Sequence, residues 1–117
     1  MSSGRARRRR SPCPVACTLD LLGDRWTLLV VRDLFLGRTR FKEFAASPEG
    51  IATNVLADRL ERLVSQGLVD RLVDGADHQR PRYVLTERGR SLEPVLESVV
   101  RWGLENLEGT EARLGPA

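Results

Sequence analysis

The sequence has few of the residues from which chemical sites are usually built. Its 117 residues include one histidine and two cysteines, and aromatic side chains make up 5% of the chain. No G-x-S-x-G motif, glycine-rich phosphate loop or set of metal ligands with the usual spacing occurs in it. We therefore predict a protein that is not an enzyme and that holds no metal or cofactor.

Long apolar segments are also absent. The longest apolar run, WTLLVV, stops at Arg32 and is far shorter than the roughly 18 residues that a membrane-spanning helix needs. Asp20 and Asp24 follow the basic N-terminus too early for the apolar core of a signal peptide. We expect no membrane partner and a cytoplasmic location, where both cysteines stay reduced.

Positive charge is concentrated at the N-terminus. Outside it the chain has 14 basic and 16 acidic side chains, so a polyanion would need a local basic surface. Residues 1–11 are interpreted as a disordered basic arm, which either contacts phosphate or only solvates the chain. Residues 109–117 are expected to form a flexible tail. The arm contains five arginines: Arg5, Arg7, Arg8, Arg9 and Arg10.

Apolar residues recur at helical spacing in most of the chain between these ends. Asp24 is placed to cap the second of the predicted helices, and Pro94 should kink or restart the last one. The predicted helices cover residues 15–22, 25–37, 41–47, 52–66 and 86–107.

The centre of the chain has the pattern of a helix-turn-helix. A short extended stretch over 38–40 leads into the helix over 41–47, and the next three residues, Pro-Glu-Gly, make a turn. The helix over 52–66 is longer and amphipathic, and Gly67 ends it. After it, two β-prone segments flank turn residues 74–81, which predicts a hairpin with a long tip.

Several motifs of this region resemble the HxlR-type family of bacterial transcription regulators. The family tends to show C-P before a small-residue helix, a W-T-L helix, R-D-L-x-x-G and R-F-x-E-[FL], and this chain reads CPVACTLDLLGDRWTLLVVRDLFLGRTRFKEF. The similarity continues through GIATNVLADRLERLVSQGLV and RYVLTERGRSLEPVLESVVRW, and it covers about residues 13–102. It implies a mainly α fold with a small β-hairpin, a winged helix-turn-helix over residues 12–108 that dimerises through its N- and C-terminal helices.

The resemblance also implies a function. The protein would be a sequence-specific regulator of transcription, a repressor that binds double-stranded DNA in the nucleoid. It would act as a homodimer on a palindromic operator. One helix of each subunit would enter a major groove, and each wing would touch the flanking backbone. The alternative is a winged helix that binds a partner protein and never meets DNA, because a fold does not fix a function.

Residues of the fourth predicted helix outside its apolar stripe are candidates for base reading, with Asn54 and Asp58 on the opposite face and Ala57 beside it. Only the first turns of a recognition helix reach base edges, which selects Thr53, Asn54, Ala57 and Asp58. Asparagine can read adenine with two hydrogen bonds, and aspartate can accept from cytosine. Arg59 and Arg62 flank this face and either contact DNA or form intrahelical ion pairs such as Asp58 with Arg62.

A second group of residues suits the DNA backbone. The hairpin tip would present His78, Gln79, Arg80 and Arg82 to phosphate or to the minor groove. A lone histidine on a polar loop is most often solvated, so His78 predicts neither a metal site nor a pH switch. Arg38 and Arg40 flank the extended stretch before the helix-turn-helix, and we expect one of them to reach a phosphate.

The last predicted helix has more apolar surface than one small domain can easily cover. Burial of this surface across a two-fold axis would place two recognition helices about 34 Å apart, as successive major grooves require. The predicted dimer interface combines it with residues of the first helix: Val15, Leu19, Leu92, Val95, Leu96, Val99 and Trp102.

The two cysteines, Cys13 and Cys17, lie four residues apart. They offer at most half of a tetrahedral metal shell, and a disulfide across one helical turn is strained. Cys17 falls among apolar residues of the first helix and is interpreted as packing. Cys13 precedes Pro14 at the positive end of the helix and near the arginines, which favours a thiolate. Some HxlR-type regulators sense oxidants or electrophiles through a cysteine at this position and others do not, so Cys13 is a candidate sensor of an oxidant or small-molecule inducer.

Overall fold

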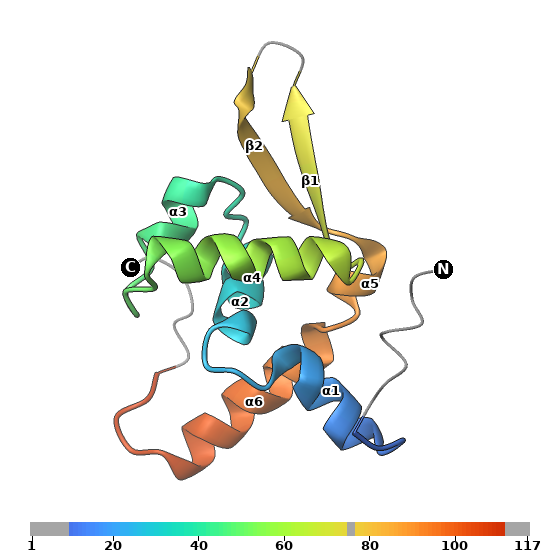
Figure 1. The fold of residues 1–117 in the computed structure, drawn as a ribbon. Coiled ribbons are helices and arrows are strands. Elements are labelled where there is room, and N and C mark those ends of the chain that lie inside the picture. Colours follow the sequence, from blue (N-terminus) through green and yellow to red (C-terminus); the bar gives the residue numbers. More distant parts are fainter. Residues whose placement is uncertain (1–9, 75–76, 112–117) are drawn as a thin grey trace.

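Helices account for most of the fold. The computed structural model describes residues 10–74 and 77–111, with side chains for all of these except residues 74 and 77–79. Figure 1 shows α4 across the middle of the molecule, with the β-hairpin standing on one side of it and α1 and α6 on the other. The elements are α1 (Pro14–Leu22), α2 (Thr27–Phe35), α3 (Phe41–Ala45), α4 (Thr53–Ser65), β1 (Val69–Asp74), β2 (Asp77–Leu85), α5 (Glu87–Arg90) and α6 (Glu93–Asn106).

The core forms where α2, α3 and α4 meet β1. The apolar stripe of α4, with Leu56, Leu60 and Leu63, is buried against Val31 of α2 and Phe44 of α3. These leucines recur every three or four residues, so they share the inner face of the helix and leave its polar residues outside. The predicted helix-turn-helix and the mainly α fold with a small hairpin are confirmed.

Gly67 ends α4 and directs the chain into the hairpin. Its φ of +75° is a conformation that side chains disfavour. The Gly67 N–H donates to the carbonyl of Val64 at 3.0 Å, and the Leu68 N–H donates to that of Leu63 at 3.0 Å. This is a Schellman ending, with Leu63 and Leu68 both buried beneath it. The wing is therefore attached to the recognition helix by a single fixed turn.

The hairpin is antiparallel, with Val69 opposite Leu85 and Arg71 opposite Tyr83. The predicted long tip over 74–81 is wrong, because β2 already begins at Asp77. Pro81 misled the prediction. The register of the hairpin shifts between Leu72 and Asp74, which are opposite Arg82 and Asp77, and Pro81 lies in this irregular part of β2. A proline is tolerated at such a bulge because no hydrogen bond between the strands requires its missing N–H there.

The outer side of β2 is tied to the connection between α2 and α3. The Tyr83 N–H donates to the carbonyl of Thr39 at 2.8 Å, and Arg40 forms an isolated bridge with Arg82. The predicted extended stretch over 38–40 is thus reduced to one bridge. The base of the wing is held from two directions, by α4 and by this connection.

The last predicted helix is divided in two, as Pro94 led us to expect. Thr86 caps α5 by accepting the N–H of Gly89 at 3.0 Å, and α6 restarts with Pro94 in its first turn. A Cβ on Gly89 would lie 2.0 Å from the carbonyl oxygen of Leu68, so only glycine lets α5 pack here. In the part of the chain that the structure covers, no helix has the length and apolar character needed to cross a membrane.

Candidate nucleic-acid interface

The first turns of α4 present an open polar face. Thr53, Asn54, Ala57 and Asp58 are all exposed, and Asn54 and Asp58 lie opposite the buried leucine stripe. The N-cap residue is Ala52, and no side chain caps the helix. The side chains of Thr53 and Asn54 form no hydrogen bond with any residue in 10–74 or 77–111. Their donors and acceptors are therefore available to an external partner.

The charge of Asp58 is compensated by two arginines of the same helix. Its Oδ2 accepts from Nη1 of Arg59 at 2.5 Å and from Nη1 of Arg62 at 3.3 Å. The predicted pair of Asp58 with Arg62 is present, and both side chains are about half exposed. An acid on the face that would meet a polyanion is thus compensated, while the outer side of Arg62 stays open to solvent.

Arg59 joins α4 to the start of α2. Its Nε lies 3.1 Å from Oδ1 of Asp24, and the Arg59 side chain is only 18% exposed. Asp24 also accepts the N–H groups of Trp26 and Thr27 at 2.8 and 3.0 Å and the Thr27 hydroxyl at 2.5 Å. Burial alone would raise the pKa of Asp24, but these hydrogen bonds together hold that pKa well below its usual range. The structure therefore places Arg59 between two helices and not on the open face.

A buried carboxylate organises the other end of α2. Asp33 is 2% exposed, and its Oδ1 accepts from Arg32 at 3.0 and 3.1 Å and from Nη1 of Arg38 at 2.6 Å. The hydroxyl of Ser47 donates to its Oδ2. Arg38 is one of the two arginines of which we expected one to reach a phosphate, and it uses one side of its guanidinium within the protein. Sequence reasoning missed Asp33, although an acid between Val31 and Leu34 in an apolar helix was a signal.

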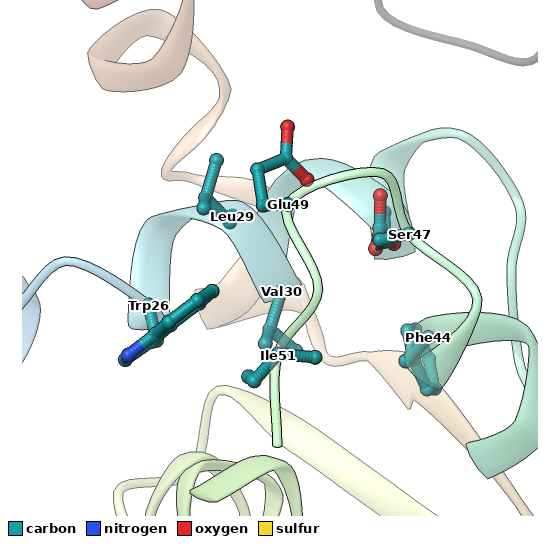
Figure 2. Close-up of a pocket in the computed structure, with 8 residues that line it drawn as sticks. Trp26, Leu29, Val30, Phe44, Ser47, Glu49 and Ile51 are labelled. Atoms are coloured by element: carbon teal, nitrogen blue, oxygen red, sulfur yellow. Dashed lines mark hydrogen bonds between the residues drawn. The ribbon is translucent and has the colours of Figure 1, made fainter. Parts of the chain in front are cut away.

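The turn before α4 is fixed by the same group of residues. Arg32 binds Glu49 through two hydrogen bonds of 2.7 and 2.8 Å, and this contact lowers the pKa of Glu49. Figure 2 shows the small hollow between α2 and this turn, where Ile51 and Trp26 lie on the apolar side and Ser47 and Glu49 on the polar side. The entry angle of α4 is consequently set by ion pairs as well as by apolar packing.

The wing carries further cations. The Arg40 guanidinium donates to the carbonyl of Arg80, which draws it to the hairpin. Arg80 is exposed and Arg82 half-buried, and neither side chain forms a hydrogen bond with the residues that the structure describes. The side chains of His78 and Gln79 lie outside the described part. A groove between α4 and the wing is lined by Arg71, which sequence reasoning also missed.

The two thiols differ in environment. Cys13 is the N-cap residue of α1 and is exposed, and its N–H donates to the hydroxyl of Ser11 at 3.1 Å. Cys17 is half-buried and its thiol donates to the carbonyl of Ser11 at 3.3 Å. Both are free cysteines. Among the described residues, no cluster of His, Cys, Asp and Glu has an arrangement that could hold a metal ion.

An amphipathic helix with an open polar face, a fixed turn before it and a β-hairpin directly after it define a winged helix-turn-helix transcription regulator. The chain belongs to the HxlR-like helix-turn-helix family, which it matches over residues 21–111. The family resemblance of the sequence is confirmed.

Relatives of the family are found among both sequences and solved structures. An uncharacterised HTH-type transcriptional regulator of Mycobacterium tuberculosis is 41% identical over 97 residues, which are 83% of this chain and 61% of that protein's length. The reduced form of the redox regulator HypR superposes with a TM-score of 0.74 at 33% identity, covering 82% of this chain and 95% of HypR. The reduced form of YodB from Bacillus subtilis has a TM-score of 0.68 at 31% identity, covering 86% of this chain and all of YodB.

Proposed function

We propose that this protein is a sequence-specific, double-stranded DNA-binding repressor that acts as a homodimer on the chromosome, in the cytoplasm. The observation that carries the proposal is the open face of α4, where the Thr53 and Asn54 side chains are exposed and form no hydrogen bond with the part of the chain that the structure describes. The wing stands on one side of α4 (Figure 1), and the regulators of the same family support the assignment.

Base reading falls to the first two turns of α4. Asn54 can form two hydrogen bonds with adenine, Thr53 offers a hydroxyl and a methyl group, and Ala57 can contact the thymine methyl. Asp58 holds Arg59 and Arg62 and is the least suited of the predicted set to meet DNA directly. Phosphate contacts fall to Arg62, to the outer sides of Arg38 and Arg40, and to the wing residues His78, Gln79, Arg80 and Arg82.

The proposed dimer rests on apolar side chains that one subunit leaves uncovered. Val15 and Leu19 of α1 are 66% and 52% exposed, and Val99 and Trp102 of α6 are 52% and 60% exposed. Val95 continues the same surface. The two other predicted interface residues pack within their own subunit: Leu92 and Leu96. Two-fold pairing of α1 and α6 implies a palindromic operator.

We further propose that Cys13 makes the repressor responsive to oxidants or electrophiles. Its thiol is exposed at the N-terminus of α1, two residues before Val15 of the surface assigned to the dimer, and one of the similar structures is described as a redox regulator. Diamide takes two hydrogen atoms from two thiols and is itself reduced to the hydrazine, so it would join the Cys13 thiols of the two subunits in a disulfide. This disulfide should release the protein from DNA. Cys13→Ser should abolish this release while Cys17→Ser retains it; release that is equal in Cys13→Ser and the parent protein would eliminate the sensor.

The experiment that tests the function is selection of bound duplexes from a random pool, followed by titration of the selected site. Asn54→Ala should relax the preference at one base position in each half-site, at a cost of about 1–3 kcal/mol. The other asparagine, Asn106 at the end of α6, provides a matched control and should leave the preference intact. If the parent protein binds every duplex equally and weakly, the alternative of a partner-binding winged helix gains support.

A further inference from the structure

A groove separates α4 from the wing. Ala57, Glu61 and Val64 of α4 line one wall, and Arg71 and Tyr83 line the other. Arg71 and Tyr83 are direct partners in the hairpin, so their side chains leave the sheet on the same face. The ring of Tyr83 meets that of Phe44 edge-on, with centroids 6.3 Å apart. The wing side of the groove is therefore anchored in the core.

Arg71 is the cation among the residues that line this groove. Its side chain is exposed and forms no hydrogen bond or ion pair with any residue in the described ranges. By contrast, Arg59 and Arg62 of α4 are paired with Asp24 or Asp58. Glu61 faces Arg71 across the groove without forming an ion pair with it. The charge of Arg71 is thus free for an anion from outside.

The position of the groove along α4 identifies that anion. Glu61 lies seven residues after Asn54, which is roughly 10 Å at 1.5 Å per residue. The major groove of DNA is about 12 Å wide. With the first turns of α4 at the base edges, the helix therefore reaches the rim of the major groove near Glu61. The rim is where the sugar-phosphate backbone runs.

We propose that Arg71 binds a backbone phosphate of DNA in the groove between α4 and the wing, with the ring of Tyr83 as the fixed wall beside it. The inference rests on the proposed DNA-binding function. It adds a phosphate-binding residue on β1, ahead of His78, the first of the tip residues that the sequence analysis selected. Because phosphate carries no sequence information, Arg71 strengthens binding to every duplex alike.

The test measures affinity by fluorescence anisotropy between 50 and 200 mM salt, on the selected duplex and on an unrelated one. Arg71→Ala removes one phosphate-binding cation, so it should reduce the slope of log affinity against log salt by about 0.9. The loss of affinity relative to the parent protein should therefore be about 3.5-fold smaller at 200 mM than at 50 mM salt, on both duplexes. Arg71→Lys should keep the slope. Arg88→Ala, which removes the same charge from the exposed surface of α5, is the matched control and should leave the slope unchanged.

The outcomes separate this inference from the proposed function. Suppose that the parent protein binds its selected duplex and that Arg71→Ala has the same salt slope as Arg88→Ala. The phosphate site at Arg71 is then wrong, while the proposed DNA-binding function is retained. A loss of affinity in Arg71→Ala that is confined to the selected duplex would also overturn the phosphate site, because it would indicate that Arg71 reads a base. If the parent protein shows no salt-dependent binding to any duplex, the proposed function itself fails. Circular dichroism of each variant confirms that the hairpin and helices are intact.

Discussion

The guanidinium of Arg59 in α4 lies against the carboxylate of Asp24, 35 residues earlier in the chain, with Nε and Oδ1 3.1 Å apart. The same carboxylate caps the start of α2 through the N–H groups of Trp26 and Thr27. One acid therefore holds two helices, and Gly23 alone separates it from α1. The angle between the recognition helix and the N-terminal part of the fold depends on this contact.

Replacement of Arg59 should affect stability more than DNA binding. We expect Arg59→Ala to lower the free energy of unfolding by about 1–2 kcal/mol, because it removes charge-assisted hydrogen bonds that are largely shielded from solvent. Arg62→Ala, which breaks an exposed pair, should cost no more than about 0.5 kcal/mol. Urea denaturation of the two variants checks this, and an equal decrease in both would contradict the role assigned to Arg59.

Acid should destabilise the protein in part through Asp24. The pKa of Asp24 is lower in the folded state than in the unfolded chain, where it is about 4. The ionised carboxylate therefore stabilises the fold fully above the unfolded pKa, and this stabilisation is lost as the pH falls through the folded pKa. Asp24→Asn should therefore be less stable than the parent at pH 7 and lose less on acidification. Asp70→Asn, at an exposed position of β1, should keep the pH dependence of the parent. Urea midpoints at pH 7 and pH 3 measure both effects.

The buried Asp33 should be among the most sensitive positions of the chain. Asp33→Asn would leave Arg38 without its charged partner beneath the turn that precedes α4, and breaking such a buried pair costs about 3–5 kcal/mol. Asp58→Asn, at an exposed acid of α4, should cost less than about 1 kcal/mol. Thermal unfolding that places the two variants at the same midpoint would show that the Asp33 network does not hold the fold.

Gly89 should not accept any side chain. An added methyl group would lie 2.0 Å from the carbonyl oxygen of Leu68 and 2.9 Å from the side chain of Leu85. Backbone cannot move aside as a flexible side chain can, so we expect Gly89→Ala to cost about 2–3 kcal/mol. Gly103→Ala is the control, because no atom lies within 4 Å of the added carbon and the helix of α6 favours alanine. The comparison is made by urea denaturation.

A charge placed on the exposed face of α6 should disrupt the proposed dimer. Val99→Glu would bury an uncompensated carboxylate in the interface, at a cost on the order of 3 kcal/mol, or about a hundredfold in association. Val73→Glu introduces the same charge at an exposed valine of the wing and should remain dimeric. Light scattering across a range of concentrations measures the difference. A parent protein that stays monomeric at micromolar concentration would contradict the dimer itself.

The sequence predicted the local structure of this protein better than the contacts between distant residues. The apolar period of α4, the glycine after it and the proline of α6 determine structure within a few residues, and these elements were predicted within one or two positions. The length of β2 was not predicted correctly, because the position of Pro81 relative to β1 depends on strand pairing. The contacts of Asp33 and Arg59 could not be predicted, since Ser47 and Asp24 lie 14 and 35 residues away.

Helix α1 contributes no buried residue to its own subunit. A nine-residue helix on its own is only marginally stable in water, and tertiary packing normally supplies what is missing. In the proposed dimer the other subunit adds to this packing, so the backbone amides of α1 should gain further protection from hydrogen exchange on assembly. The Cys13 thiol stands at the first turn of this segment. Covalent modification there would act on a helix that has no buried residue in its own subunit, where a small free-energy change would shift the balance between assembled and separate subunits.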